Sequence, residues 1–339
     1  MIPASLRTLL DETTGQRRAE WAGREVWLAN EAWGELALSL QGGQLLHYLP
    51  AGASDAPEDA RAAGANPSAD AAPEAMVPGG WLWVTPTPQA LPGTIRGGIP
   101  LCWPWFADDR YADESEDHSG PFHGTARQAQ WRLDAVDEHE EGVELHLSPE
   151  QRLHQQLAPR LVVQANANRL HVELITEHTG ETPVKMSGAL HTYLAVADTF
   201  ACRLEGLPGA RYLDKLAGFA EGEQQGELGV RGGIDRIYHS NAELVLDDGE
   251  RRLRIARQGS DSAVVWHPGE TLPADTPARS HAASSAWKPP TPVSTRYGWC
   301  PAPSTCWVPR CRGSKATVRP TRLAARHRAD GAGPSVRRP

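Results

Sequence analysis

Residues 35–49 read Glu-Leu-Ala-Leu-Ser-Leu-Gln-Gly-Gly-Gln-Leu-Leu-His-Tyr-Leu. Leucines at every second position from 36 to 40 alternate with smaller or polar residues, which is typical of a strand with one buried face. The Gly42-Gly43 pair predicts a turn, and the apolar run that follows Gln44 predicts a second strand. This stretch therefore predicts antiparallel β-structure.

Similar patterns recur along the chain and predict further strands. The expected strands cover residues 25–28, 131–136, 143–147, 160–164 and 169–176. Asp-Asp-Gly-Glu at 247–250 separates two expected strands, 243–246 and 251–257, which predicts a hairpin. Helical periodicity is scarce, and only residues 5–12 are expected to form a short helix. We therefore expect an all-β sandwich.

Length and composition exclude several classes of protein. The chain has 339 residues, of which 40% are hydrophobic and 22% charged, as is usual for globular proteins. No apolar run approaches the roughly 20 residues that a membrane-spanning helix needs, so we expect no membrane partner. The N-terminus lacks the apolar core and cleavage site of a secretory signal, which favours the cytoplasm. The five cysteines do not suggest a disulfide framework. We expect a monomer.

Two segments depart from the general pattern. Residues 51–75 are rich in Ala, Pro, Asp and Gly and lack large apolar side chains, so we expect a disordered insertion there. The last 53 residues hold 11 of the 34 Lys and Arg but only one of the 42 Asp and Glu, so the tail carries about +10 and the rest about −18. We expect a β-sandwich domain over 1–270 and a disordered, aberrant basic tail over 271–339.

Three short segments combine turn residues with aromatic or ionisable side chains. Residues 96–106 hold three bulky aromatics, whose faces suit the apolar face of a sugar, next to Arg96, which suits an anion. His123 and Arg127 stand four residues apart in a loop that contains glycine, and His191 interrupts a strand-like segment. Histidine transfers protons near neutral pH. Each segment is also open to a structural interpretation, as a packed turn or as a histidine bonded to the backbone.

Other signals are weaker. Asp235 fits either a surface ion pair or a carboxylate that binds hydroxyl groups, and residues 264–268 look like a strand that runs into a loop. No P-loop, dinucleotide fingerprint or zinc-protease motif is present, and the 13 histidines show no compact ligand spacing. The sequence therefore predicts neither an organic cofactor nor a metal.

Taken in order, six motifs resemble the aldose 1-epimerase superfamily, and more closely its hexose-6-phosphate mutarotase branch, the glucose-6-phosphate 1-epimerases. The motifs are RGGIPLCWPWF (96–106), HGTAR (123–127), LHTYL (190–194), GLPGARYLDK (206–215), DRIY (235–238) and VVWHP (264–268). The family usually has HGFAR and VVWNP, so Thr125 and His267 are departures, although neither replaces a proposed chemical group. The resemblance covers roughly residues 20–270.

This resemblance implies a galactose-mutarotase-like β-supersandwich. It also implies interconversion of the α and β anomers of a hexose 6-phosphate without a cofactor. By motif match, His191 is the catalytic acid that protonates the ring oxygen, and His123 hydrogen-bonds the substrate oxygens. Arg96 and Arg127 hold the phosphate, where guanidinium geometry permits bidentate contacts, and Asp235 accepts hydrogen bonds from sugar hydroxyls.

The family's general base, a Glu in a late Val-Glu-Ala-Ala-Asn strand, is not found. Residues 287–291, Trp-Lys-Pro-Pro-Thr, stand at about its place. One possible DNA coding of Val-Glu-Ala-Ala-Asn, when read one base later, encodes Trp-Lys-Pro-Pro-Thr. The same one-base shift of a family-like C-terminal sequence, Leu-Val-Pro-Gly-Thr-Gln-His-Val-Leu-Gly-Ala, encodes residues 299–309. We hypothesise that the chain is out of frame from a point between Gly269 and Trp287. The C-terminal strands would then be missing and the activity very weak.

The encoding DNA tests this hypothesis, because a single-base shift must restore a Glu-Ala-Ala-Asn string; otherwise the tail is a divergent basic segment.

Three other functions stay open. The Arg and His positions without the base fit a non-catalytic sugar-phosphate binder. The basic tail fits nucleic-acid binding, but it lacks regular aromatic interleaving, and we expect no nucleic-acid partner. The third is a mutarotase of an unphosphorylated aldose, although Arg96 and Arg127 favour a phosphorylated sugar.

Overall fold

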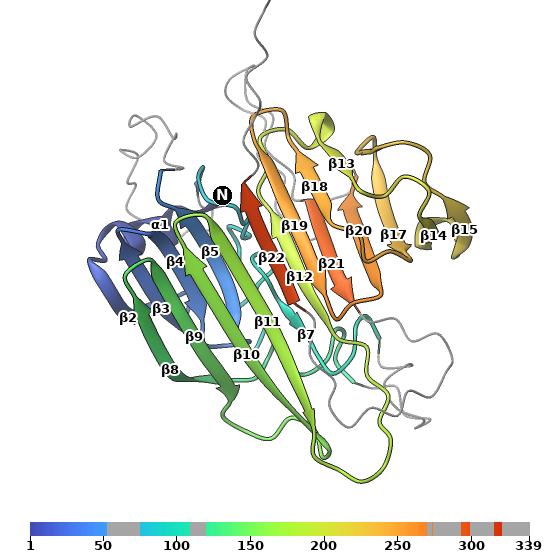
Figure 1. The fold of residues 1–339 in the computed structure, drawn as a ribbon. Helices are drawn as coiled ribbons and strands as arrows, with labels where there is room; N and C mark the ends of the chain where they lie inside the picture. The colour runs from blue at the N-terminus through green and yellow to red at the C-terminus, as the bar shows by residue number, and fades with distance from the viewer. Residues whose placement is uncertain (53–74, 109–119, 270–272, 274–292, 299–314, 321–339) are drawn as a thin grey trace, which may run out of the picture.

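The structure is a computed structural model that describes residues 1–52, 75–108, 120–269, 273, 293–298 and 315–320. These residues form four antiparallel sheets of two, four, seven and nine strands, so the expected all-β class is confirmed. In Figure 1 the N-terminal strands (blue) lie at one end of the molecule, and the strands within residues 211–223 and 233–238 lie at the other. The expected insertion at 51–75 falls almost entirely on residues 53–74, outside the described residues. The division into a domain and a tail stays a prediction.

The four-stranded sheet is a meander with a helix against it. Its strands are β2 (Gly15–Trp21), β3 (Arg24–Glu31), β4 (Gly34–Ser39) and β5 (Gln44–Pro50), and the helix is α1 (Ala4–Asp11). The expected strand–turn–strand at 35–49 and the short helix are confirmed. One detail of the prediction is wrong: β4 buries both faces. Its Leu36 and Leu38 join the main core, whereas Ala37 packs with Leu6 and Leu10 of α1, because the helix covers the face that was expected to be exposed.

The nine-stranded sheet has the order β16-β13-β18-β19-β22-β11-β10-β9-β8. Its strands are β8 (Trp131–His139), β9 (Gly142–Pro149), β10 (Leu157–Asn166), β11 (Arg169–His178), β13 (Arg203–Glu205), β16 (Leu228–Gly229), β18 (Leu244–Asp247), β19 (Arg252–Gln258) and β22 (Lys315–Pro320). The strands expected between 131 and 176 are confirmed, and β18 and β19 form the expected hairpin.

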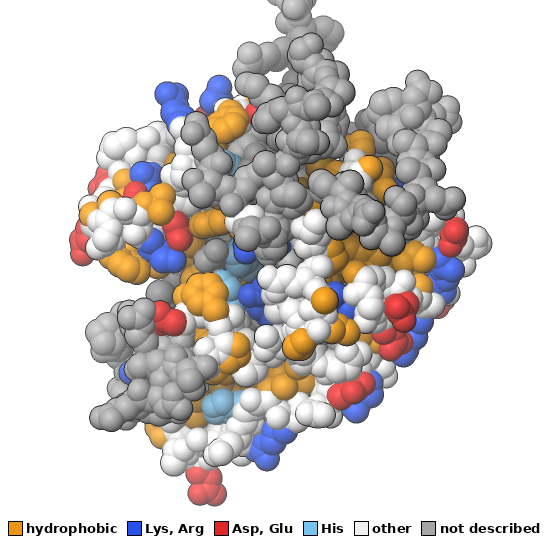
Figure 2. Space-filling view, turned by 180° about the vertical axis from the view of Figure 1, so that it is seen from behind, with side chains coloured by type: hydrophobic (Ala, Val, Ile, Leu, Met, Phe, Trp, Pro, Cys, Tyr) orange, Lys and Arg blue, Asp and Glu red, His pale blue; other side chains and the backbone are white. Residues whose placement is uncertain are grey.

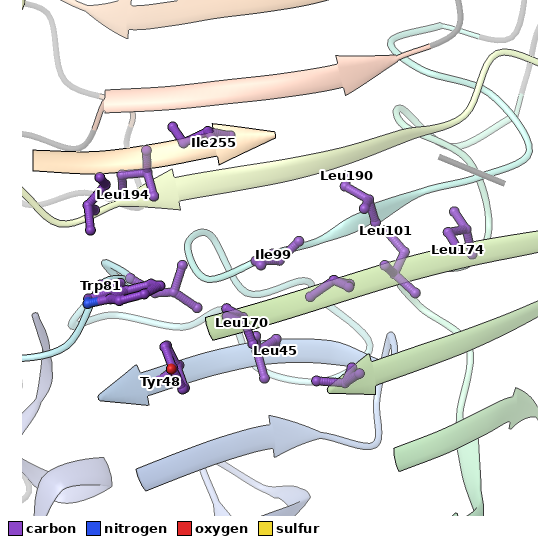
Figure 3. Packing of buried hydrophobic residues seen from close by; sticks show 14 of the residues in the cluster. Leu45, Tyr48, Trp81, Ile99, Leu101, Leu170, Leu174, Leu190, Leu194 and Ile255 are labelled. Atoms are coloured by element: carbon purple, nitrogen blue, oxygen red, sulfur yellow. The ribbon is translucent and has the colours of Figure 1, made fainter. Parts of the chain in front are cut away.

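The seven-stranded sheet, which carries the candidate site, has the order β15-β14-β17-β20-β21-β12-β7. Its strands are β7 (Leu101–Cys102), β12 (Ala189–Leu194), β14 (Arg211–Asp214), β15 (Ala220–Glu223), β17 (Gly233–Tyr238), β20 (Ser262–Pro268) and β21 (Val293–Gly298). A small sheet pairs β1 (Ile2–Pro3) with β6 (Met76–Val77). The main core contains residues from all three larger sheets, such as Tyr48, Leu170, Leu190 and Ile255 (Figure 3).

The expectation that strands after residue 270 are missing is wrong for two segments. β21 pairs with both β20 and β12, and β22 pairs with both β19 and β11. Each segment therefore fills a gap between two strands that present unpaired backbone groups. Backbone pairing depends little on side-chain identity, which is why a segment of unusual composition can occupy such a gap. The frame hypothesis itself concerns the coding DNA and stays a hypothesis.

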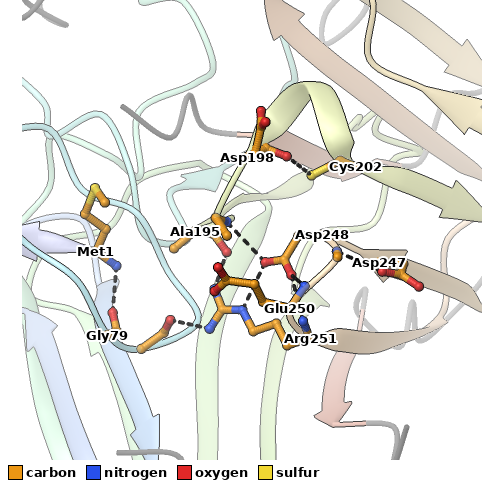
Figure 4. A network of polar contacts seen from close by, with 12 residues as sticks. Met1, Gly79, Ala195, Asp198, Cys202, Asp247, Asp248, Glu250 and Arg251 are labelled. Atoms are coloured by element: carbon orange, nitrogen blue, oxygen red, sulfur yellow. Dashed lines mark hydrogen bonds and ion pairs between the residues drawn. The ribbon is translucent and has the colours of Figure 1, made fainter. Parts of the chain in front are cut away.

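A polar network ties the β18–β19 hairpin to the end of β12 (Figure 4). Asp248 accepts hydrogen bonds from the backbone N–H groups of Arg251 (2.8 Å) and Ala197 (3.2 Å). The Arg251 guanidinium donates to the carbonyl oxygens of Gly80 (2.9 Å) and Ala195. Buried carbonyl groups need such partners, and the network supplies them where three segments meet.

The described part of the chain has no helix with the length and apolar character that a membrane crossing requires.

Candidate active site

Two ring side chains stand together on the outer face of β12. His191 and Tyr193 are two residues apart and so point to the same face, while Leu190 and Leu194 point into the core. The imidazole and phenol rings are stacked, with centroids 4.4 Å apart and planes 5° apart. The Tyr193 hydroxyl lies 3.2 Å from His191 Nε2. Both side chains are buried, with exposed fractions of 2% and 3%.

The second imidazole, His123, comes from the loop that carries HGTAR. Its ring centroid lies 5.8 Å from that of His191, nearly perpendicular to it. The backbone N–H of Ala107 donates to His123 Nδ1 over 2.8 Å. Nδ1 is therefore an acceptor, and the proton of the neutral ring sits on Nε2. The ring also packs beside Phe106 (5.0 Å) and Phe122 (4.1 Å), so its position is fixed on several sides.

Glycine explains why this loop folds as it does. Gly124 has φ = +78°, and a Cβ added there would lie 2.1 Å from the Trp103 carbonyl oxygen. The two residues form an isolated parallel bridge, which brings the aromatic segment 96–106 against the HGTAR loop. His123 itself has φ = +71°, a strained value for a residue with a side chain. Backbone strain at a buried imidazole is typical of functional positions.

The two arginines lie around one loop. Arg96 Nη1 donates to the Tyr193 hydroxyl over 3.3 Å, so a chain of contacts runs from Arg96 through Tyr193 to His191. Arg127 Nη2 donates to Thr94 Oγ1 over 3.1 Å, two residues before Arg96. Within the described residues, Arg127 Nε is buried without a hydrogen-bond partner.

Asp235 lies farther along the same face of the sheet. It is in register with Trp266 across the β17–β20 pair, and the Trp266 ring meets that of Tyr193 with centroids 6.4 Å apart. Asp235 Oδ2 accepts from Lys215 Nζ over 3.0 Å. An indole ring thus separates the carboxylate from the imidazoles. Aromatic faces of this kind suit the apolar face of a pyranose.

The structure therefore brings His191, His123 and Arg96 together, sets Arg127 beside the Arg96 loop and places Asp235 beyond Trp266. Three residues at the site were missed by sequence reasoning: Tyr193, Trp266 and Lys215. Tyr193 could have been found from strand alternation, because it follows His191 by two residues. Trp266 could have been found in the same way within VVWHP, but nothing in the sequence links Lys215 to Asp235.

The departure at His267 lies away from this face. Residue 267 alternates with Trp266, and its side chain is buried on the inner side of β20. Its Nδ1 contacts the Gly232 carbonyl (3.2 Å) and the Gly269 N–H (3.1 Å). Burial lowers the pKa of His267. Its role is consistent with packing beneath the site.

A carboxylate beside His191 is not found on the neighbouring strand. β21 lies between β12 and β20, with Arg296 in register with His191. Residues 293–298 contain no Asp or Glu, and the only acidic residues in the sequence after Glu270 are Asp275 and Asp330. No glutamate follows Glu270, so the chain has no residue for the late-strand base that the resemblance implies. In the described ranges, no three His, Cys, Asp or Glu side chains gather as a metal site would require.

Figure 2 views the face opposite to that of Figure 1. Near its centre, histidine and Lys or Arg side chains lie beside one another and next to hydrophobic ones. Imidazole, guanidinium and aromatic side chains thus gather where strand β12 meets the loops that carry Arg96 and His123. The fold and this set of side chains define a protein of the galactose-mutarotase type.

The family model "Aldose 1-epimerase" matches residues 24–302, so the chain belongs to the aldose 1-epimerase family. A Salmonella typhimurium protein named "Putative glucose-6-phosphate 1-epimerase" is 30% identical over 200 residues, which cover 56% of this chain and 65% of that relative. An Escherichia coli protein of the same name is 28% identical over 245 residues, which cover 70% of this chain and 71% of that relative.

Solved structures show the same fold. The crystal structure of a "putative mutarotase" from Salmonella typhimurium has a TM-score of 0.73 at 22% identity and covers 94% of this chain and 100% of that one. A galactose 1-epimerase from Lactobacillus acidophilus has a TM-score of 0.53 at 12% identity, over 90% of this chain and 97% of that one. The expected β-supersandwich is confirmed by these likenesses.

Proposed function

We propose that this site binds a hexose 6-phosphate and is arranged to interconvert its α and β anomers. One observation carries the proposal: His191 lies 5.8 Å, ring to ring, from His123 and is linked through the Tyr193 hydroxyl to Arg96. Two imidazoles and an arginine that can bind a phosphate are thereby joined in one cluster. The names of the bacterial relatives point to the same substrate.

In this mechanism His191, as imidazolium, gives a proton to the ring oxygen while the O1 proton is removed. The C1–O5 bond breaks, O1 becomes the aldehyde oxygen, and rotation about C1–C2 presents the other face of C1. The ring then closes as O5 attacks C1, O1 takes up a proton, and His191 recovers its own from O5. His123 Nε2–H donates to a substrate oxygen throughout, because Nδ1 is held by Ala107.

Arg96 and Arg127 hold the phosphate. Guanidinium groups bind phosphate oxygens in a bidentate manner, and such charge-assisted bonds are about twice as strong as neutral ones. Tyr193 holds Arg96 before the substrate arrives. Asp235 accepts from hydroxyls at the far side of the Trp266 ring.

The general base that should remove the O1 proton is not found in this chain. The sequence offers no glutamate after residue 270, so we expect water or buffer to take this role. A positioned base contributes about 10²–10⁴-fold to such a rate. The chain should therefore bind the sugar phosphate and turn it over slowly.

The same missing glutamate favours a second function, a non-catalytic sugar-phosphate binder. Binding would then be the selected property and exchange between anomers would stay at the uncatalysed rate. Measured exchange, as described at the end of the Discussion, separates the two functions.

Binding tests the proposal first. Calorimetry should show that glucose 6-phosphate binds the unmodified chain more tightly than glucose does. Arg96→Ala should weaken the phosphorylated sugar by about 10–100-fold, the value of one or two charge-assisted bonds, and leave glucose unchanged.

Arg132→Ala is the matched control, because Arg132 is an exposed arginine of β8 that pairs with Asp134. It should bind both sugars like the unmodified chain. Equal affinity of the unmodified chain for glucose and glucose 6-phosphate would contradict the proposal.

A further inference from the structure

Gln44 is a buried polar residue that contacts the backbone on both sides of Arg96. It begins β5 and is 2% exposed. Its amide nitrogen donates to the carbonyl oxygen of Ile95 over 3.1 Å and to that of Gly97 over 2.7 Å. Only the NH₂ end of a glutamine can face two carbonyl oxygens, so both of its donors are used on the residues that flank Arg96.

The backbone of Arg96 itself is fixed by neighbouring segments. The Thr85 N–H donates to the Arg96 carbonyl oxygen over 2.9 Å. The Ile99 N–H donates to the Leu45 carbonyl oxygen over 2.8 Å, so the segment continues beside β5 (Figure 3). A Cβ added at Gly98 would lie 2.0 Å from that same oxygen, so the close approach leaves no room for a side chain. Three consecutive carbonyl groups, that of Arg96 and those on either side of it, therefore accept hydrogen bonds from inside the protein.

The loop before Arg96 is held from the same four-stranded sheet. Arg24 is 2% exposed, and its Nη2 donates to the carbonyl oxygens of Gln89 and Gly93. Gln41 accepts from Arg24 Nε and donates to the Gly93 carbonyl oxygen over 3.3 Å. These contacts end three residues before Arg96, whereas those of Gln44 lie on both sides of it.

We propose that Gln44 is a positioning residue for phosphate recognition, which acts by holding the backbone of Arg96. This inference rests on the proposed function and names a residue that sets the preference of the site for a phosphorylated sugar. With the backbone fixed on both sides, phosphate binding restricts only the side-chain rotations of Arg96, so less conformational entropy is lost. A bidentate contact also tolerates displacements of only about 0.5 Å. Gln44 acts through Arg96 and makes no contact with the sugar phosphate itself.

A second buried glutamine offers a matched control. Gln224 is 7% exposed, and its amide nitrogen donates to the carbonyl oxygens of Gln225 (3.4 Å) and Gly226 (3.3 Å). Its Oε1 accepts from the Tyr238 hydroxyl over 2.8 Å. Gln224 follows the edge strand β15, far from β12 in the order of the seven-stranded sheet. Gln224→Met therefore removes similar hydrogen bonds from a buried place away from the site, and methionine keeps the size of the side chain.

The experiment compares glucose 6-phosphate with glucose by calorimetry, using the full chain. Gln44→Met should weaken glucose 6-phosphate by about 10-fold and glucose by less than about 2-fold, since a displaced guanidinium loses charge-assisted bonds to phosphate alone. Gln224→Met should bind both sugars like the unmodified chain. In the Arg96→Ala background, Gln44→Met should weaken glucose 6-phosphate by less than about 2-fold further, because residues that act through one contact are not additive.

Gln44→Asn is a milder second variant, which carries the test if Gln44→Met does not fold. It keeps the amide but shortens its reach, so it should lower the preference for the phosphorylated sugar by about 3-fold, the value of part of one hydrogen bond. An unfolding midpoint close to that of Gln224→Met would show that a Gln44 variant folds.

The outcomes separate this inference from the proposed function. Suppose that the unmodified chain prefers glucose 6-phosphate to glucose. If the folded Gln44 variants keep that preference, if Gln224→Met loses it equally, or if the loss is as large in Arg96→Ala, the assignment of Gln44 is overturned and the proposed function stands. If the unmodified chain shows no preference for glucose 6-phosphate, the proposed function fails and this inference fails with it.

Discussion

At the scale of single residues, the central feature is a hydroxyl placed between a cation and an imidazole. The Tyr193 oxygen lies 3.3 Å from Arg96 Nη1 and 3.2 Å from His191 Nε2. Arg96 has further N–H donors for a phosphate while Nη1 stays on Tyr193. Under the proposed function, Tyr193 therefore couples phosphate binding by Arg96 to the position of His191.

Tyr193→Phe tests that coupling. The ring stack on His191 should survive, but Arg96 loses the acceptor that orients it. We expect an affinity for glucose 6-phosphate about 5–10-fold weaker, the value of about 1 kcal/mol for one hydrogen bond. Calorimetry checks this, with glucose as the control ligand. Unchanged affinity for the phosphorylated sugar would show that Tyr193 does not orient Arg96.

At the scale of elements, the alternation of apolar and polar side chains predicted most of the strands that could be predicted from the sequence. It placed β4, β8–β11 and the β18–β19 hairpin from their alternating side chains, and the apolar run after Gln44 placed β5. The burial of both faces of β4 could not be seen, since it depends on a helix 30 residues away. The contact between Lys215 and Asp235 was equally invisible, because it joins the 3₁₀ turn after β14 to strand β17 and leaves no local pattern.

The motifs predicted the composition of the site better than its geometry. His191, His123 and Arg96 meet, as the resemblance implied, because they lie on segments whose glycines allow close backbone packing. The strands β21 and β22 could not be predicted, because their sequence lacks the pattern of a buried strand while the neighbouring strands provide two free edges. For these two segments, the side-chain pattern does not predict a strand, whereas the free backbone groups of the neighbouring strands favour one.

Gly124→Ala tests how far the site depends on close backbone packing. Gly249→Ala is the control, because its φ of +88° imposes the same backbone strain but no atom lies within 4 Å of the added Cβ. We expect Gly249→Ala to cost about 1–2 kcal/mol in the free energy of unfolding. Gly124→Ala should cost at least about 2 kcal/mol more, since its Cβ would meet the Trp103 carbonyl.

Urea unfolding gives the two free energies. Gly124→Ala should also weaken glucose 6-phosphate, because any shift of the loop moves His123. Equal destabilisation by both alanines would mean that the loop can relax away from Trp103.

At the scale of the whole molecule, a buried charged triad makes stability depend on pH. Glu35 accepts from Arg7 (2.6 and 3.0 Å) and contacts His47 Nε2 (3.0 Å). Burial alone would raise the pKa of Glu35, but the hydrogen bonds from His47 and Arg7 lower it to about 2. Burial lowers the pKa of His47 from 6.5, against the opposing effect of Glu35.

Both shifts destabilise the fold in acid. Below pH 6.5 the unfolded chain protonates His47 while the folded chain does not, and below 4.5 the same holds for Glu35 until the pH approaches 2. The unfolded state thus binds more protons, so the free energy of unfolding falls as pH falls. Urea unfolding at pH 7.5, 5.5 and 4 should show a steady decrease.

Glu35→Gln isolates the triad. It leaves Arg7 buried without its carboxylate, so we expect a loss of about 3–5 kcal/mol at pH 7.5. The further loss between pH 5.5 and 4 should be smaller than in the unmodified chain, because one of the two titrating groups is gone. An unchanged slope would mean that the acid sensitivity arises elsewhere.

The most direct measurement is exchange NMR of the glucose 6-phosphate anomers in the presence of the unmodified chain. The central claim is a sugar-phosphate site that has its acid but lacks its carboxylate partner. We expect the sugar to bind. We expect its anomers to exchange at most about 10²–10⁴-fold faster than without protein, which is the gain that one positioned acid supplies. His191→Ala should lose this gain. Fast exchange beyond that gain, or exchange that His191→Ala leaves unchanged, would contradict the account.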